Sequence, residues 1–418
     1  MTELDPQLMQ QVRARFAYVD TCPFQGSRIF FENAGGALTL NSVVETSTKF
    51  AAIPDNQGRD NVASHGLVDT INKAKSDAAD LFGASSGQFF VGESGTELLF
   101  RLVRNAATAA KAGGMILGST IEHPATRSAA QHWAENTNRP YVSVPHDNET
   151  GLSRAEDYAK YVTPDTRVAC ILHASPVTGM GMDVAAIAAA IRAVSPECYI
   201  VVDGVQNAAH GTLDIDSYDV DGYAISPYKM FSRHGYGFAW VSDRFMHAPH
   251  EQLIGGPETA WEFGTRDTGS YATFSDVVTY LDWLGAQTAP SENRRERLIG
   301  AGKAILAHEK ALCDAMIHGI GNLSGLAEMT DVEIIGGLDN PNRKGMVSFR
   351  IKGKASAEIV TALNERGIRT HTRKADHYSG NVLDPLGWSD CVRVSMCHYN
   401  TIDEVRSFLT AMTEISSL

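Results

Sequence analysis

The sequence predicts an α/β protein in which a large domain with a mostly parallel β-sheet is followed by a smaller C-terminal α+β domain. Between about residues 40 and 275, short apolar runs typical of buried strands alternate with longer helical stretches. Such alternation indicates a parallel sheet with helices on both faces. Beyond a long helical stretch at 291–318, further strand-like runs and helices indicate a second unit. We expect an N-terminal segment (1–30) that packs with the small domain, a large domain (31–290) and a small domain (291–418).

The expected elements follow from the apolar runs in chain order. An amphipathic helix at 5–19 should precede a short strand at 28–31. Strands of the large sheet are expected at 88–91, 114–117, 168–172, 199–202 and 238–241, with helices such as 183–194 between them. The small domain should contain strands at 332–335, 345–350, 368–372 and 391–397, and helices near 355–365 and 402–415. Since there is no flexible linker, the two units should pack against each other.

Composition excludes several classes of protein. The formal net charge of −13 argues against a nucleic-acid partner, because phosphate backbones are bound by clustered Lys and Arg. No apolar run approaches the roughly 20 residues of a membrane span, and the acidic N-terminus does not resemble a secretion signal. The six cysteines are scattered without metal-binding spacing. We expect a cytoplasmic enzyme with reduced thiols, no metal and no membrane or nucleic-acid partner.

Lys229 is the most informative residue of the chain. An apolar run at 198–202 indicates a buried strand, and Asp203 and Gln206 lie at its end. Lys229 follows 26 residues after Asp203, shortly after Ser226. A lysine can form a Schiff base with a carbonyl cofactor, and an aspartate can keep a pyridine nitrogen protonated. Pyridoxal phosphate (PLP) needs both to act as an electron sink. A lone lysine after an apolar run is usually a solvated loop residue, but the ordered set indicates PLP.

The expected topology supports the same site. Ligands of parallel sheets bind beyond the carboxyl ends of the strands, where Gly95, His173, Asp203 and Lys229 would gather. The small residues of 92–96 lie between a strand and a helix expected to begin near Glu97. Their backbone N–H groups could approach a phosphate at the helix N-terminus. Alone, this segment could equally be an ordinary helix cap.

Several short motifs, in the same order, resemble the class V aminotransferase family. The resemblance is to its branch of cysteine desulfurases, selenocysteine lyases and isopenicillin N epimerases. The matching segments are Phe31-Glu-Asn-Ala-Gly35, Glu122-His123, Asp203 with Gln206, Ser226-Pro-Tyr-Lys229, Gly264-Thr265 and Arg393-Val-Ser395. The resemblance implies the fold type I of PLP-dependent transferases, with a seven-stranded sheet in the large domain. It also implies PLP as cofactor and an amino acid as substrate.

The resemblance implies roles around the cofactor ring. Lys229 would carry PLP and then move protons at the substrate α-carbon, and Asp203 would face the pyridine nitrogen. Gln206 would bond the phenolic oxygen, and His123 would stack on the ring and could shuttle protons. The catalytic set is thus Lys229, His123 and Asp203. A structural histidine or a strand-end aspartate capping a turn would be the ordinary alternatives.

Further roles concern the phosphate and the substrate. The phosphate would be bound by Gly95, Thr96, Ser226 and Tyr228, the last in place of a family histidine, and by Thr265 from the partner subunit of a homodimer with shared sites. Arg393 would bind the substrate carboxylate through two parallel hydrogen bonds, and Asn33 would also contact the substrate. An exposed strand arginine is the alternative for Arg393.

The chain departs from the resemblance at the position that defines a desulfurase. The family carries a nucleophilic cysteine on the loop that corresponds to 367–378, and Asp376 stands near that position. A carboxylate cannot accept sulfur as a persulfide. Pro176 also replaces a usual asparagine. The basic and aromatic residues of the loop indicate either a polar or acidic substrate or simply a solvated loop; they are His371, Arg373, Lys374, His377 and Tyr378.

Three functions remain open on this evidence. The first is a lyase that eliminates a leaving group from the β-carbon of an amino acid by breaking a C–S bond, without a persulfide cysteine. The second is an epimerase or aminotransferase, which differs in where the proton returns. The third is a non-catalytic scaffold, which the presence of Lys229 and Asp203 disfavours.

Overall fold

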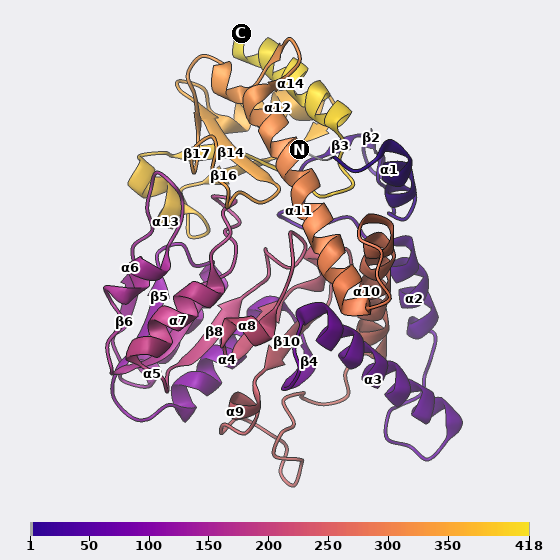
Figure 1. The fold of residues 1–418 in the computed structure, drawn as a ribbon, viewed down its shortest axis with the longest axis vertical. Coiled ribbons are helices and arrows are strands. Elements are labelled where there is room, and N and C mark those ends of the chain that lie inside the picture. The colour runs from indigo at the N-terminus through magenta and orange to yellow at the C-terminus, as the bar shows by residue number, and fades with distance from the viewer. Residues whose placement is uncertain (1–2, 418) are drawn as a thin grey trace.

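The large unit is built around one seven-stranded sheet. The computed structural model describes residues 3–417, and in it the strand order is β4 (Gln88–Gly92), β10 (Gly237–Val241), β9 (Gly222–Ile225), β8 (Tyr199–Asp203), β7 (Thr166–Leu172), β5 (Met115–Ser119) and β6 (Tyr141–Val144). Only β10 runs against the other strands, because it pairs antiparallel with both β4 and β9. The predicted mostly parallel sheet is therefore confirmed (Figure 1).

Helices cover both faces of this sheet, and the alternation of strand side chains explains why. Successive residues of a strand point to opposite faces. Phe90, Ile116 and Val168 pack in one buried cluster with α4 (Gly95–Ala109) and α5 (Pro124–Asn136). Their neighbours Phe89, Leu117 and Ala169 pack in the other cluster, which includes α3 (Val62–Phe82), α7 (Val184–Val194) and α10 (Thr268–Thr288).

The small unit contains a four-stranded antiparallel sheet. Its order is β13 (Val332–Ile334), β14 (Met346–Ile351), β17 (Asp390–Ser395) and β16 (His371–Lys374). Helices α12 (Ser356–Glu365) and α14 (Ile402–Ser417) pack on it. The long helix α11 (Arg294–His318) runs from the helices of the large unit up to this sheet (Figure 1). A buried apolar cluster formed by the sheet, α11 and α14 includes Phe31.

The N-terminal segment contacts both units. Helix α1 (Pro6–Arg13) and the residues after it place Val12 and Phe16 in the core of the large unit. Strand β3 (Ile29–Phe30) instead pairs in parallel with β15 (Ile368–Arg369) of the small unit. The remaining short elements are β1 (Thr21–Cys22), β2 (Gly26–Ser27), α2 (Asn41–Ala51), α6 (Ala155–Ala159), α8 (Ile215–Tyr218), α9 (Asp243–Met246), β11 (Gly319–Ile320), β12 (Leu323–Ser324) and α13 (Gly380–Leu383).

Three expectations about elements are corrected. Strands β6 and β9 were not predicted, because β6 is a partly exposed edge strand and β9 is the short run Gly-Tyr-Ala-Ile. The strand expected at 368–372 is wrong as one element: β15 and β16 are separated at Thr370 and pair with different partners. The helix expected at 5–19 ends at Arg13.

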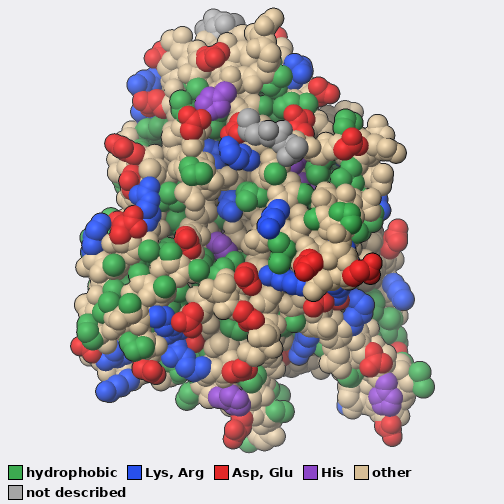
Figure 2. All heavy atoms as spheres, viewed as in Figure 1, with side chains coloured by type: hydrophobic (Ala, Val, Ile, Leu, Met, Phe, Trp, Pro, Cys, Tyr) green, Lys and Arg blue, Asp and Glu red, His purple; other side chains and the backbone are tan. Residues whose placement is uncertain are grey.

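The length of the helices and the charge of the visible surface are relevant to membrane and nucleic-acid binding. Within the described chain, none of the helices has the length and apolar character that crossing a bilayer requires. Figure 2 shows acidic and basic side chains interspersed over the face of the molecule in view, without a continuous basic stripe.

Candidate active site

Side chains predicted for the site lie where five parallel strands of the large sheet end. Gly95 follows β4, His123 follows β5, His173 follows β7, Asp203 ends β8 and Lys229 follows β9. Because the carboxyl ends of parallel strands meet at one edge of a sheet, residues far apart in the sequence are brought to one place. The gathering expected from the sequence is therefore present.

Lys229 lies in a short 3-10 turn, Pro227–Lys229, directly after β9. Its Nζ donates a hydrogen bond of 3.3 Å to Oε1 of Gln206. Burial, followed by the positive charge of Arg393, lowers the pKa of Lys229 to about 8, against the opposing effect of Asp203. An amine with this pKa is partly neutral near physiological pH and can act as a nucleophile and a base.

Asp203 is 2% exposed and accepts two hydrogen bonds. Thr126 Oγ1 donates to its Oδ2 over 2.9 Å, and the backbone N–H of Val205 donates to its Oδ1 over 3.1 Å. Burial raises the pKa of Asp203, and these hydrogen bonds and Lys229 oppose the rise. A carboxylate in this setting favours a positively charged partner, such as a protonated pyridine nitrogen. Thr126 was not predicted, since a threonine inside a helix gives no signal in the sequence.

His123 directly precedes α5 and caps it, because its Nδ1 accepts a hydrogen bond of 3.2 Å from the backbone N–H of Ala125. This bond places the ring proton on Nε2. Burial, and then the charge of Lys229, lower the pKa of His123 to about 3. The ring is therefore neutral at physiological pH. Its neighbour Glu122 is buried between Ser119 and the backbone of Leu172, and burial raises the pKa of Glu122 to about 8.

A cradle for an anion lies at the N-terminus of α4. The first N–H groups of a helix have no acceptor within it, and Gly95 and Thr96 occupy that turn. A Cβ atom at Gly95 would collide with the Ser226 hydroxyl, so only glycine lets this hydroxyl approach the helix. The ring of Tyr228 stacks on His234 at 4.2 Å between centroids. Backbone and hydroxyl donors of this kind fit a phosphate.

Thr265 lies apart from these residues within the single chain. It lines a hollow of about 270 Å³ together with Asp55, Gln57 and Arg266. Arg266 forms an ion pair with Glu93, in the loop that leads to the anion cradle. A contribution of Thr265 to the cradle remains an expectation about a partner subunit.

Arg393 extends from β17 of the small unit toward the large unit. Its Nη1 donates a hydrogen bond of 3.0 Å to the backbone oxygen of Pro176, which follows β7. Its Nε is buried without a hydrogen-bond partner. Burial, followed by the charge of Arg373, lowers the pKa of Arg393 to about 10, so it remains a cation. The backbone of Gly35 passes next to the guanidinium.

Asn33 lies beneath this segment with its amide already in use. Its Nδ2 donates to the backbone oxygen of Ser395 over 2.8 Å and to Oδ1 of Asn400 over 3.2 Å, and its Oδ1 accepts from the Tyr399 hydroxyl. These bonds tie the 33–36 segment to the end of β17, where Arg393 lies.

Five of the six cysteines are buried, and Cys22 is partly exposed. Cys391 lies on the same strand as Arg393, and burial raises its pKa to about 12. Asp376 is exposed on the loop after β16. Because the thiolate is the nucleophilic form of cysteine, Cys391 is poorly suited to attack.

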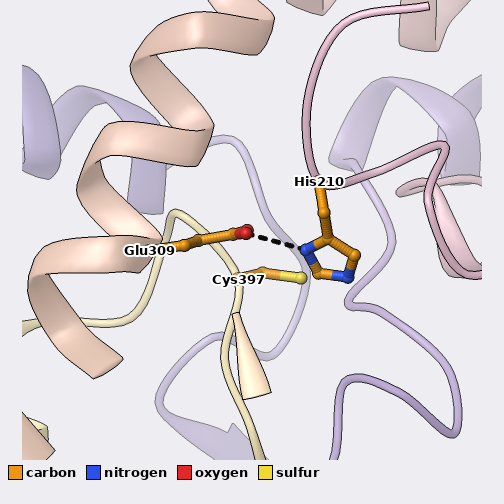
Figure 3. Close-up of side chains that lie close together, drawn as sticks. All are labelled: His210, Glu309 and Cys397. Carbon is orange, nitrogen blue, oxygen red and sulfur yellow. Dashed lines mark hydrogen bonds and ion pairs between the residues drawn. The ribbon is translucent and has the colours of Figure 1, made fainter. Parts of the chain in front are cut away.

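A second buried polar cluster consists of His210, Glu309 and Cys397. His210 follows Gln206 by four residues, and Cys397 follows Arg393 by four residues. His210 Nδ1 and Glu309 Oε2 are 2.8 Å apart, and the thiol of Cys397 lies beside them (Figure 3). The three groups lie close enough to hold a metal ion. As placed, the facing atoms of His210 and Glu309 bond to each other and so connect the loop after β8 to α11. This cluster was not predicted, because its members are about 90 residues or more apart in the sequence.

Comparison with known proteins identifies the class first. The fold resembles the cysteine desulfurase of Thermococcus onnurineus with a TM-score of 0.81, at 20% identity and covering 100% of this chain and 99% of that one. It resembles the cysteine desulfurase CsdA of Escherichia coli with a TM-score of 0.78, at 21% identity over 97% and 98% of the two chains. The fold is therefore that of the fold type I PLP-dependent enzymes.

The sequence then identifies the family. The family model described as aminotransferase class-V matches residues 29–297 and 299–408. Among curated relatives, the cysteine desulfurase-like protein ustD of Aspergillus flavus is 24% identical over 97% of this chain and 90% of its own. A probable cysteine desulfurase of Halobacterium salinarum is 26% identical over 99% and 98%. The chain belongs to the class-V aminotransferase family and is a PLP-dependent enzyme.

Proposed function

We propose that the protein binds PLP at the ends of β4, β5, β8 and β9 and catalyses elimination from the β-carbon of an amino acid. The cofactor assignment rests on the proximity of Lys229, Gln206 and Asp203, with the anion cradle of Gly95 at the same edge of the sheet. When bound, PLP supplies an electron sink for the bond broken at the substrate α-carbon. Proteins similar to this chain are named cysteine desulfurases, which supports an amino-acid substrate.

The proposed roles follow from the positions of the side chains. Asp203 would hold the pyridine nitrogen protonated, and Gln206, whose amide nitrogen has no partner within the described residues, would donate to the phenolic oxygen. His123 would cover the ring as a neutral imidazole. The phosphate would accept from Gly95, Thr96, Ser226 and Tyr228.

Substrate binding and proton transfer would fall to two residues. Arg393 would bind the α-carboxylate, because its buried Nε still lacks an acceptor. Lys229, with its pKa near 8, would take the α-proton as its amine and donate it later as the ammonium. Asn33 would position the segment beside Arg393 rather than touch the substrate, since its amide is already bonded.

The reaction would proceed without a cysteine persulfide. Asp376 stands on the loop where the family's nucleophilic cysteine is expected, and the pKa of Cys391 is about 12. A lyase needs only Lys229, PLP and the carboxylate site. The test is product analysis with L- and D-amino acids, where we expect a keto acid with ammonia and the released leaving group.

The role of thiols can be tested separately. A Cys22→Ser and Cys391→Ala double variant removes the partly exposed thiol and the thiol on the same strand as Arg393. We expect it to release sulfide from L-cysteine at the rate of the unmodified enzyme. Loss of release with retained PLP absorption would instead show a persulfide mechanism.

An epimerase or aminotransferase of the same family is the alternative. The same amine would serve it, because Lys229 can also remove and return a proton at the α-carbon in these reactions. An epimerase would return the inverted amino acid, and an aminotransferase would need a second keto acid. Either product pattern would replace the lyase assignment.

A further inference from the structure

Arg373 is a cation beside the proposed site that none of the roles above uses. It lies on β16, next to β17, in a register that pairs His371 with Arg393 and Arg373 with Cys391. Residues two apart on a strand share a face, so Arg373 and Arg393 are diagonal neighbours on one face, about 7–8 Å apart at the backbone. Lys374, the next residue, belongs to the opposite face and is exposed.

Tyr378, on the loop after β16, lies between Arg373 and His123. The guanidinium carbon lies 5.7 Å from the ring centre of Tyr378, and that ring centre lies 6.3 Å from the ring of His123. Arg127, on α5, donates a hydrogen bond of 2.8 Å to the backbone oxygen of His377. The loop is thereby fixed to the same helix that His123 caps.

The charges around Arg373 are not balanced within the chain. Arg373 Nε donates to the Ser379 hydroxyl over 2.8 Å, and among residues 3–417 it makes no ion pair. The nearest acidic influence is Asp376, which is exposed. The carboxylate that faces Arg393, Glu32, lies 3.3 Å from His371. Like charges confined together favour the binding of anions.

Most charged groups of the proposed site would have a partner of opposite charge once cofactor and substrate are bound. The proposed cofactor phosphate would occupy the cradle at α4, Asp203 would be matched by the pyridine nitrogen, and a substrate α-carboxylate would neutralise Arg393. Glu122 is buried and, with a pKa near 8, stays largely protonated at pH 7. Glu32 faces Arg393 and His371, so Arg373 is left with only the exposed Asp376 as an acidic neighbour.

We propose that Arg373 binds a second oxyanion on the side chain of the substrate, so that the enzyme prefers acidic amino acids, such as those with a carboxylate or phosphate on the β-carbon. This inference rests on the proposed function, since it places the α-carboxylate on Arg393. A planar guanidinium binds either kind of oxyanion through two hydrogen bonds. In a lyase, a phosphate on the β-carbon would leave as inorganic phosphate with the electrons of the broken C–O bond, and Arg373 would then also stabilise this leaving group. A β-carboxylate would be bound by Arg373 but not eliminated.

The first measurement uses unreactive ligands. Binding of succinate and of butyrate to the PLP-loaded enzyme is measured by calorimetry. A charge-assisted hydrogen bond changes affinity by about 10- to 100-fold, so succinate should bind that much more tightly than butyrate. Arg373→Gln should remove the difference, Arg373→Lys should keep part of it, and Lys374→Gln should keep all of it. Equal affinities in the unmodified enzyme, or an unchanged difference in Arg373→Gln, would overturn the proposal.

The second measurement separates this proposal from the proposed function. Spectral titration and turnover are compared for O-phospho-L-serine against L-serine and for L-aspartate against L-asparagine, which also distinguishes phosphate from carboxylate. Preference for either acidic member, lost in Arg373→Gln, supports the proposal. Turnover of neutral amino acids with no preference would overturn it and leave the proposed function standing. Binding of succinate through Arg373 with no response to any amino acid would overturn the proposed function alone.

Discussion

Burial lowers the pKa of Lys229 and raises the pKa of Asp203, so that it favours the neutral form of each residue. The charge of each residue partly offsets the shift of the other. Desolvation disfavours any isolated charge, while an opposite charge nearby favours it. The result is an amine that is half deprotonated near pH 8. This property of single residues decides when Lys229 can react.

The uptake of PLP by the apoenzyme should therefore depend on pH. The reactive neutral amine of Lys229 is the minor form below its pKa of about 8 and the major form above it. We expect the uptake rate, followed by absorbance, to rise with pH through an inflection near pH 8 and then to level off. In Arg393→Gln, a positive charge that lowers this pKa is lost, so the inflection should move to higher pH. An inflection that stays fixed or moves down would contradict the electrostatic account.

Asp203→Asn tests the carboxylate beside the ring. The substitution keeps the shape and the hydrogen bond to Thr126 but removes the charge. Removing one partner of a buried charge pair costs roughly 3–5 kcal/mol, or about 150- to 5000-fold. We expect kcat to fall by that factor while PLP stays linked to Lys229, as measured by steady-state kinetics and absorbance. A variant with nearly full kcat would show that Asp203 does not support the ring charge.

At the scale of elements, strand ends and loops bring residues of both units to the site. Strand β8 ends at Asp203, and the loop after it carries Gln206 and then His210. Strand β17 carries Arg393, and the segment after it carries Cys397. Glu309 on α11 bonds His210 and faces both segments. This cluster holds the cofactor loop against the long helix, and so it should contribute to stability more than to chemistry.

Glu309→Gln should lower the free energy of unfolding. Glu309 is fully buried, and His210 would lose a charged acceptor. Disturbing such a buried hydrogen bond costs about 1–3 kcal/mol. Lys310→Gln is the matched control, because Lys310 is exposed and its ion pair with Asp314 within α11 contributes less than about 1 kcal/mol. Denaturant unfolding of both variants measures the two free energies of unfolding. Equal decreases in the two variants would show that the cluster does not stabilise the fold more than a surface ion pair does.

The elements also show what the sequence could predict. Long apolar strands such as β7 and β8, and the helix α11, were expected nearly where they lie, because their pattern is local. Asp203 was found because it lies at the end of such a strand, and Lys229 because it follows Asp203, Gln206 and Ser226 in an ordered set. Thr126, His210 and Glu309 were not, since their roles come only from contacts across the fold. The break at Thr370 was missed because the run 368–372 is continuous in the sequence but is divided between two sheets.

At the scale of the whole molecule, Thr265 of the single chain lines a hollow that is separate from the anion cradle. The homodimer with shared sites remains a prediction, in which the Thr265 hydroxyl reaches the phosphate of the partner subunit. Loss of one such hydrogen bond to a charged group should weaken PLP binding by about 10- to 100-fold. We expect that weakening in Thr265→Ala.

Mixing two defective variants tests whether Thr265 acts across subunits. In a mixed dimer of Lys229→Ala and Thr265→Ala, one site would combine an intact Lys229 with an intact Thr265 of the other chain. Activity at limiting PLP should then exceed that of either variant alone. No gain after subunit exchange, verified by sedimentation, would place Thr265 in its own chain's site or outside any site.

The central claim is that Lys229 carries the cofactor, and borohydride reduction of the PLP-loaded enzyme followed by peptide mass spectrometry tests it most directly. Reduction makes the lysine–cofactor linkage permanent, so the added mass marks the residue that carries it. We predict the label on the peptide that contains Lys229, and its loss, together with the near-visible absorption band, in Lys229→Ala. A label on another lysine, or an unchanged spectrum in that variant, would contradict the account.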